Sequence, residues 1–224
     1  MKTLTVVTAA CCIAVGNAHA TTINFDDVNA SLGDVDLATL SPYQGFTWSN
    51  FYAYTSQPGF PGFNNGIVSG SNAVYSGGEQ ASGSSVAPII GSIQSSTPFN
   101  LVSSYMGSGN YDNLNVTVEG LSGSTVLFTK VVSVNTGPAQ LIDFGYTGIT
   151  AVDLFATTTS GTTDPYACGS FDCTQFTLDD VTVTQGSTQA SVPEPATLGL
   201  LMSGVISLLP LARRRRLSSI RKVV

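Results

Sequence analysis

Two pairs of adjacent aspartates occur in the same sequence pattern near the two ends of the central part of the chain. Asp26 and Asp27 lie in the segment INFDDV, and Asp179 and Asp180 lie in FTLDDV. In both segments the apolar alternation shifts by one residue across the aspartates. A strand that buries the apolar residues before and after the aspartates therefore needs a bulge there. The first and last strands of a β-sandwich are often neighbours, so we expect the four carboxylates to lie close together.

Carboxylates brought together repel one another unless a cation or hydrogen-bond donors neutralise them. Carboxylate and backbone carbonyl oxygens are the ligands that calcium prefers. One hypothesis is therefore a structural calcium site formed by Asp26, Asp27, Asp179 and Asp180. The pattern is similar to that of jelly-roll carbohydrate-binding modules, in which acidic residues near the terminal strands hold a structural ion. The alternative is that each pair ends a strand or accepts backbone hydrogen bonds at a turn.

Aromatic side chains form a second group that could bind a ligand. Eight of the 20 aromatic residues lie between Tyr43 and Phe63, and those at alternate positions of a predicted strand over 46–54 share one sheet face. Sugar rings stack on such faces. The segment 58–63, PGFPGF, predicts a loop, so we expect Tyr54, Phe60 and Phe63 to be the exposed rings. The candidate polysaccharide-binding residues are Trp48, Tyr52, Tyr54, Phe60 and Phe63. Because aromatic residues at strand spacing also fill cores, core packing is the alternative.

The charged residues are divided unevenly between the centre of the chain and its ends. Between Thr21 and Val192 there are 13 acidic residues and one basic residue, Lys130, which gives a net charge of about −12. We expect this part to repel nucleic acid and anionic lipid and to attract divalent cations. Because the only histidine is His19, a Ser-His-Asp triad and a histidine-ligated zinc site are excluded there. The absence of arginine from the same part excludes an arginine clamp for phosphate.

Short runs of β-branched and aromatic residues, separated by Gly, Ser, Thr and Asn clusters, predict an all-β domain over residues 21–185. No stretch keeps the apolar period of a long helix. The predicted strands are 22–25, 46–54, 73–75, 89–94, 99–106, 114–119, 125–134, 139–144, 150–156 and 175–184. About ten strands fit a single antiparallel, jelly-roll-like β-sandwich.

The N-terminal residues 1–20 predict a secretory signal peptide. Lys2 precedes an apolar stretch that ends in the small-residue site Ala18-His19-Ala20, so we expect the Sec export machinery to bind this segment and cleavage to follow Ala20. Cys11 and Cys12 fall within the segment and make a lipoprotein signal the alternative. In the exported part, Cys168 and Cys173 are expected to form a disulfide within one loop, because this part lies outside the cytoplasm.

The C-terminus carries a linker, an apolar segment and a basic tail. Residues 186–195 are a linker that ends in the PEP motif, residues 196–212 are apolar, and residues 213–224 are the tail. The apolar segment has 17 residues, a helical length of about 25 Å that is near the minimum for a transmembrane helix. The arginines after it predict that the tail stays in the cytoplasm. The motif residues are Pro193, Glu194, Pro195, Arg213, Arg214, Arg215 and Arg216.

This order of motif, apolar helix and arginine cluster resembles the sorting signal of PEP-CTERM proteins, which Gram-negative bacteria export and an exosortase processes. The resemblance implies an exosortase partner and a location in the cell envelope, at the cell surface or in the extracellular matrix. A plain C-terminal membrane anchor is the alternative. The segments from Tyr43 to Phe51 and from Phe176 to Val181 also resemble exported domains that commonly carry this tail.

Three classes of function remain. We expect a non-catalytic exported protein of the cell surface or exopolysaccharide matrix, with no nucleic-acid partner. The alternative is a carbohydrate-binding module with a structural calcium. A glycoside hydrolase or lyase is the third class, because paired carboxylates need no histidine. Glu79 and Glu119 are the only glutamates between residues 21 and 185 and stand in no recognisable catalytic pattern, which weighs against it.

Overall fold

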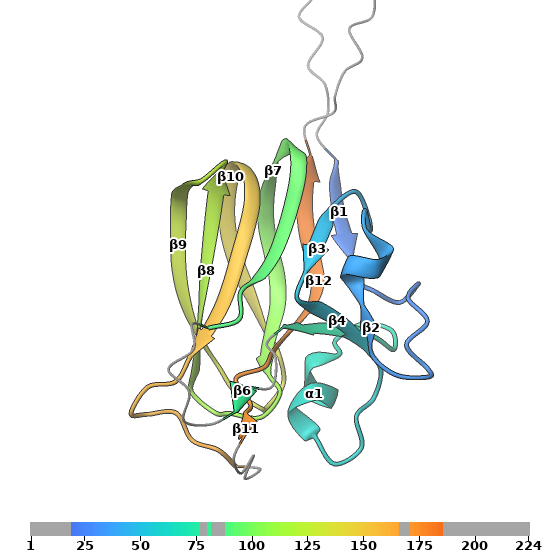
Figure 1. Ribbon diagram of the computed structural model, residues 1–224, viewed down its shortest axis with the longest axis vertical. Helices are drawn as coiled ribbons and strands as arrows, with labels where there is room; N and C mark the ends of the chain where they lie inside the picture. The colour runs from blue at the N-terminus through green and yellow to red at the C-terminus, as the bar shows by residue number, and fades with distance from the viewer. Residues whose placement is uncertain (1–18, 77–79, 82–87, 166–170, 186–224) are drawn as a thin grey trace, which may run out of the picture. The chain divides into compact units, whose positions relative to one another are not determined.

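The computed structural model describes residues 19–76, 80–81, 88–165 and 171–185 (Figure 1). The PEP motif, the apolar segment 196–212 and the basic tail lie outside the described residues, as do residues 1–18 and Cys168. The signal peptide, the transmembrane helix and the Cys168–Cys173 disulfide therefore stay predictions. Within the described ranges, no helix has the length and apolar character needed to cross a membrane.

Antiparallel strands make up most of the regular structure. In the described part of the chain, one sheet has the order β2-β4-β5-β12-β7-β10-β8-β9, with β1 paired to β12 and β3 paired to β7. Its strands are β1 Ala20–Ile23, β2 Val35–Asp36, β3 Thr47–Ser49, β4 Phe51–Tyr54, β5 Ala73–Ser76, β7 Gly91–Ser108, β8 Leu114–Ser122, β9 Thr125–Val134, β10 Gln140–Thr157 and β12 Phe176–Gln185. A small separate sheet pairs β6 Gln80–Ala81 with β11 Phe171–Asp172. The predicted all-β antiparallel class is confirmed.

Strands β7 and β10 are each 18 residues long, although the sequence predicts two shorter strands in each place. The pairing of β10 with β7 shifts register between Asp143 and Ala151. In this stretch Gly145 and Gly148 have positive φ values of 64° and 67°. Glycine adopts these angles without steric cost, so β10 bends at bulges and continues. Turn-like residues that predict a break therefore lie inside one continuous strand.

The core forms where the predicted alternation holds. In β8, Val116 and Val118 are fully buried while Asn115 and Thr117 remain partly exposed, as expected for a strand with one face towards the core. The predicted strand 125–134 is observed with the same bounds as β9. Side chains from β1, β3, β4, β7, β8, β10 and β12 contribute to one continuous core cluster.

Two short helical segments interrupt the strands, and both lie in the N-terminal part of the described chain. They are the 3₁₀ helix Leu37–Leu40 and α1 Pro61–Gly66. Helix α1 begins inside the segment 58–63, which the sequence predicts to be a loop. Its residues are poor helix formers, and Pro61 is tolerated because it stands in the first turn. A Cβ atom at Gly62 or Gly66 would collide with atoms of Gly109 or Thr177. Glycine therefore lets this helix pack directly against the sheet at β12 and the end of β7. In Figure 1 the helix lies below the label of β4.

Candidate functional site

The closing aspartate pair lies at the predicted bulge. The pairing of β12 with β7 shifts register between Asp179 and Thr182, and Asp180 has a positive φ of 48°. Because of this bulge, Leu178 and Val181 are both buried although they are three residues apart. The bend that the apolar pattern predicts is confirmed.

The opening pair follows β1 in a turn rather than within a strand. The Val28 amide donates to the Phe25 carbonyl at 3.1 Å, and Phe25 has a positive φ of 63°. Both of these apolar side chains are buried. Strand β1 pairs with β12, with Ile23 opposite Val181, so the first and last strands are neighbours as predicted.

Three of the four aspartates bind one loop, residues 68–72, which precedes β5. The Asp179 Oδ2 atom accepts the amides of Val68 at 2.7 Å and Ser69 at 2.9 Å. The Asp180 Oδ1 atom accepts the Ser69 hydroxyl at 2.7 Å. From the other side, Asp26 Oδ1 accepts the amides of residues 71 and 72 at 2.7 and 3.2 Å. These carboxylates therefore hold the loop from both ends.

The packing of the loop depends on a glycine. Gly70 has a positive φ of 55°, and a Cβ atom there would overlap the Asp26 carboxylate. No larger residue fits this position without moving the carboxylate. In the sequence, the serine and glycine residues of the loop look like an ordinary linker. In the structure, Gly70 leaves room for the Asp26 carboxylate, and Ser71 donates its amide to it.

The fourth carboxylate, Asp27, has different partners. Its Oδ1 atom accepts the Tyr43 hydroxyl at 2.5 Å, and its Oδ2 atom accepts the Gln44 side-chain amide at 3.0 Å. The described ranges contain no group of three or more His, Cys, Asp or Glu side chains that could hold a metal ion. This geometry does not assemble the four aspartates into one cation site, and calcium binding stays a prediction. The observed contacts are those of the alternative, carboxylates that accept hydrogen bonds from the backbone.

Burial changes the electrostatics of the closing pair. Asp179 has no exposed surface, and burial raises its pKa from 3.8 to about 6, against the lowering effect of its three backbone hydrogen bonds. The nearby Asp180 carboxylate contributes a further increase in the same pKa. Burial and the Asp27 carboxylate raise the pKa of Tyr43 above its ordinary value, which keeps this phenol as a hydrogen-bond donor.

The prediction of a single strand over 46–54 is wrong. The segment forms two strands, and β3 pairs with β7 whereas β4 pairs with β2 and β5. Asn50 separates β3 from β4 and has a positive φ of 58°. This residue resets the alternation, so Trp48 and Phe51 both face the core. The expected single aromatic face does not form, and the core interpretation holds for Trp48.

Tyr54 was predicted to be exposed, and this prediction is also wrong. Its hydroxyl donates to the Phe63 carbonyl at 2.7 Å, and the two rings pack edge to face at 5.5 Å. Helix α1 thus covers Tyr54 completely. Of the five predicted aromatic residues, the three that reach the surface are Tyr52, Phe60 and Phe63.

These three residues join Tyr75 in a connected group, which we call the aromatic strip. Tyr52 and Tyr75 lie opposite each other on β4 and β5, and their rings stack at 5.4 Å. Phe63 contacts Tyr75 at 5.5 Å and Phe60 at 6.3 Å. Phe60 is 46% exposed, and the other three rings are half-buried. Sequence reasoning missed Tyr75, because only the register of the two strands reveals its contact with Tyr52.

Polar groups lie beside the strip. The Asp34 carboxylate accepts the Tyr75 hydroxyl at 3.0 Å and the Gln57 side-chain amide at 3.0 Å. These contacts fix the orientation of the Tyr75 ring and place an exposed carboxylate next to it. The strip therefore combines ring faces with groups that can bind hydroxyls.

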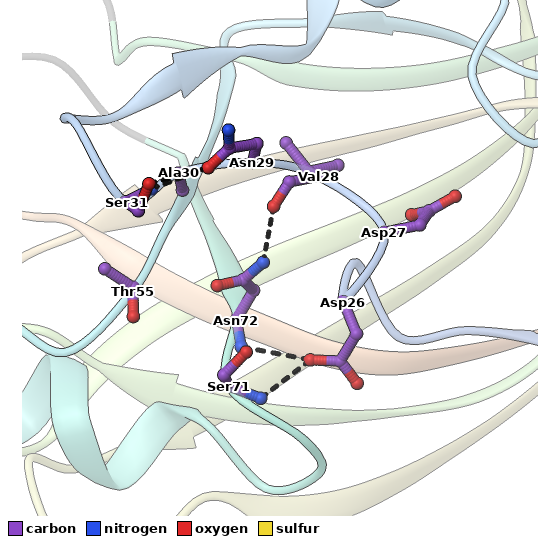
Figure 2. A pocket seen from close by; sticks show the side chains of 9 residues that line it. All are labelled: Asp26, Asp27, Val28, Asn29, Ala30, Ser31, Thr55, Ser71 and Asn72. Carbon is purple, nitrogen blue, oxygen red and sulfur yellow. Dashed lines mark hydrogen bonds between the residues drawn. The ribbon is translucent and has the colours of Figure 1, made fainter.

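A separate cavity of about 340 Å³ opens beside the turn that holds the first aspartate pair. Figure 2 shows the residues that line it: Asp26, Asp27, Val28, Asn29, Ala30, Ser31, Thr55, Ser71 and Asn72. We call this cavity the Asn72 pocket. The Asn72 side-chain amide donates to the carbonyls of Phe25 at 3.2 Å and Val28 at 2.7 Å, which fixes the turn above it.

The C-terminal segment belongs to a class of signals that direct exported proteins to their destination. Residues 191–216 match the model of the PEP-CTERM protein-sorting motif. The chain thus carries the sorting signal that its sequence resembles. The motif indicates export and sorting to the cell envelope and implies an exosortase-type processing partner.

Several solved structures are similar to this chain at low sequence identity. The K1 cleaved adhesin domain of Lys-gingipain from Porphyromonas gingivalis W83 is 11% identical, with 74% of this chain and 97% of that chain covered and a TM-score of 0.42. The CBM22-1–CBM22-2 tandem domain of Xyn10C from Paenibacillus barcinonensis is 12% identical, with coverages of 83% and 50% and a TM-score of 0.41. An apo form cyclase from Fischerella sp. is 13% identical, with coverages of 74% and 96% and a TM-score of 0.43.

No curated protein matches the sequence.

Proposed function

We propose that the exported domain is a non-catalytic surface or matrix protein that binds neutral polysaccharide through the aromatic strip. The domain is, on this proposal, a jelly-roll-like β-sandwich that the PEP-CTERM signal delivers to the cell envelope. The observation that carries the proposal is the connected row of four partly exposed rings, Tyr52, Tyr75, Phe63 and Phe60.

The chemistry of the strip suits a sugar chain. Aromatic rings present apolar faces on which the C–H faces of sugar rings stack, and such contacts need no charge on the ligand. Asp34 and Gln57, at the edge of the strip, offer hydrogen-bonding groups for sugar hydroxyls. Because the exported part carries a net charge of about −12, neutral polysaccharide is favoured over an acidic one.

The carboxylates support a binding role without catalysis. Glycoside hydrolysis uses two carboxyl groups on opposite sides of the scissile bond. Beside the strip, the described contacts place one carboxylate, that of Asp34. Asp179 is fully buried and holds the loop 68–72, so it has no route to a substrate on the strip.

Replacing Tyr52 or Phe60 by alanine is expected to weaken polysaccharide binding at least about tenfold, because each substitution removes a stacking ring from a small site. The measurement is affinity electrophoresis of the full chain in gels that contain a panel of neutral polysaccharides. Phe144→Ala is the matched control. This half-buried ring lies on β10, and strands β12 and β7 separate β10 from β5 in the sheet order.

Unchanged retardation of both strip variants would refute the role of the strip. Sugar released from the same panel by the wild-type protein would instead identify a glycoside hydrolase or lyase. An absence of both binding and release would favour a surface protein that does not recognise these polysaccharides.

The sorting signal leads to a second expected result. Mass spectrometry of the protein recovered from its native envelope and medium should find a C-terminus near Pro193 to Pro195, because exosortase processing removes the segment that follows. Recovery of chains that retain Arg213 to Arg216 would show a plain membrane anchor instead. Identification of the N-terminus in the same experiment tests the predicted cleavage after Ala20.

A further inference from the structure

The Asn72 pocket lies on the opposite face of the β4–β5 pair from the aromatic strip. Side chains alternate between the two faces of a strand. Tyr52 and Tyr75 point to the outer face, whereas Thr55 and Asn72 have the parity of the inner face. At the end of the two strands the turn 26–31 covers this inner face and leaves the cavity of about 340 Å³. The pocket and the strip are therefore separate places on the molecule.

Polar atoms without partners face the pocket. Asn72 is only 5% exposed, and its amide nitrogen is held by two carbonyl groups. Its Oδ1 atom accepts no hydrogen bond from any residue that the structure describes, and Figure 2 shows it pointing away from Val28, on the side of Thr55. Neither the Thr55 nor the Ser71 hydroxyl has a hydrogen bond within the described residues. Because Asn72 Oδ1 is not among the fully buried polar atoms of the described residues, a ligand hydroxyl can reach it, and a hydrogen bond from that hydroxyl adds binding energy.

The charges around the pocket restrict the ligand. Asp26 and Asp27 line it, and no basic side chain does, which excludes an anion. Both oxygens of Asp27 and one of Asp26 already accept hydrogen bonds. No three carboxylates converge within the described ranges to hold a metal ion. Hydroxyl groups of a neutral molecule fit this mixture of free acceptors and hydroxyls best.

We propose that the Asn72 pocket is a second binding site, which takes one neutral sugar unit. The volume lies at the small end of the range of about 300–1,000 Å³ for ligand pockets, so it suits a single unit rather than a chain. A sugar hydroxyl donates to Asn72 Oδ1, and the Thr55 and Ser71 hydroxyls bind its neighbours. This inference rests on the proposed function for its choice of a sugar, but it uses none of the residues of the aromatic strip.

The test is a saturation-transfer difference NMR titration of the full chain, in a detergent without a sugar headgroup, with glucose, galactose and mannose in turn. Thr55→Val removes one hydroxyl and keeps the side-chain shape, so it should weaken binding of the recognised sugar about two- to tenfold. Ser71→Leu adds bulk at an exposed lining position and should abolish binding. Thr125→Val, at an exposed threonine of β9, is the matched control and should bind as the wild type does.

The strip variant Tyr52→Ala separates this inference from the proposed function. If it binds the monosaccharide normally while Thr55→Val and Ser71→Leu do not, the pocket is a sugar site whether or not the strip binds polysaccharide. Monosaccharide binding that is lost in Tyr52→Ala and unchanged in both pocket variants would place the sugar on the strip and overturn the inference. The inference also fails if none of the three sugars gives saturation transfer with the wild-type protein.

Discussion

Replacement of Trp48 by alanine is expected to destabilise the domain by about 3–5 kcal/mol, the usual range for truncating a buried tryptophan. The side chain has no exposed surface. Its ring packs edge to face against Phe25 at 5.5 Å and Phe51 at 5.4 Å. Its Nε1 atom donates to the Tyr43 carbonyl at 3.1 Å, so truncation also removes one of the two hydrogen bonds to this carbonyl, which keeps the Phe46 amide at 3.0 Å.

Denaturant unfolding followed by far-ultraviolet circular dichroism measures this effect, since Trp48 is the only tryptophan and its fluorescence is lost in the variant. Tyr52→Ala is the comparison. Its half-exposed ring stacks on Tyr75, and its loss should lower the free energy of unfolding by no more than about 1.5 kcal/mol. A Trp48→Ala protein of unchanged stability that no longer binds polysaccharide would place Trp48 in the ligand site and contradict the structure.

The contrast between these two residues shows where sequence reasoning succeeded. Strict alternation in 114–119 predicted β8, because one face of the strand contacts the core and the side-chain period is two. A less regular alternation, with Lys130 on the apolar parity, predicted β9 over 125–134. The same logic failed between residues 46 and 54. There, the left-handed Asn50 breaks the period, and a rule based on alternation cannot see a single residue with positive φ.

The site was predicted in part for the same reason. The shift in apolar parity predicted the bulge at Asp179 and Asp180, because burying both Leu178 and Val181 requires it. The partners of these carboxylates could not be predicted. Val68 and Asp179 are separated by 111 positions, and their contact depends on helix α1 packing against the sheet through two glycines. Nothing local in the sequence encodes that contact.

The buried Asp179 gives the domain a pH dependence opposite to that of a typical salt-bridged carboxylate. Its pKa is raised to about 6 in the folded state, against 3.8 ordinarily. Below about pH 4 both states hold the proton, and its contribution to stability is fully present. Between about pH 4 and 6 the unfolded chain releases the proton while the folded chain keeps it. The unfolded state is therefore favoured as the pH rises, and the contribution is lost as the pH passes the folded-state pKa.

Asp179→Asn isolates this contribution, because the amide cannot titrate. A raised pKa of this size corresponds to about 3 kcal/mol, so the stability of the wild type relative to the variant should fall by roughly that amount from pH 4 to pH 7. The Asn oxygen can still accept hydrogen bonds from the amides of Val68 and Ser69. Its NH₂ group takes the place of the oxygen that accepts the Asp180 amide, so that hydrogen bond is lost. This loss lowers the stability of the variant by the same amount at every pH.

Urea unfolding curves of both proteins, followed by Trp48 fluorescence at half-unit steps of pH, measure the difference directly. Taking the difference removes the titration of the other carboxylates, which both proteins share. A difference that is constant between pH 4 and 7 would mean that Asp179 titrates alike in the folded and unfolded states. A difference that rises with pH would mean that the hydrogen bonds from the loop 68–72 outweigh burial and lower its pKa instead. Either result would contradict the balance of forces that holds this loop.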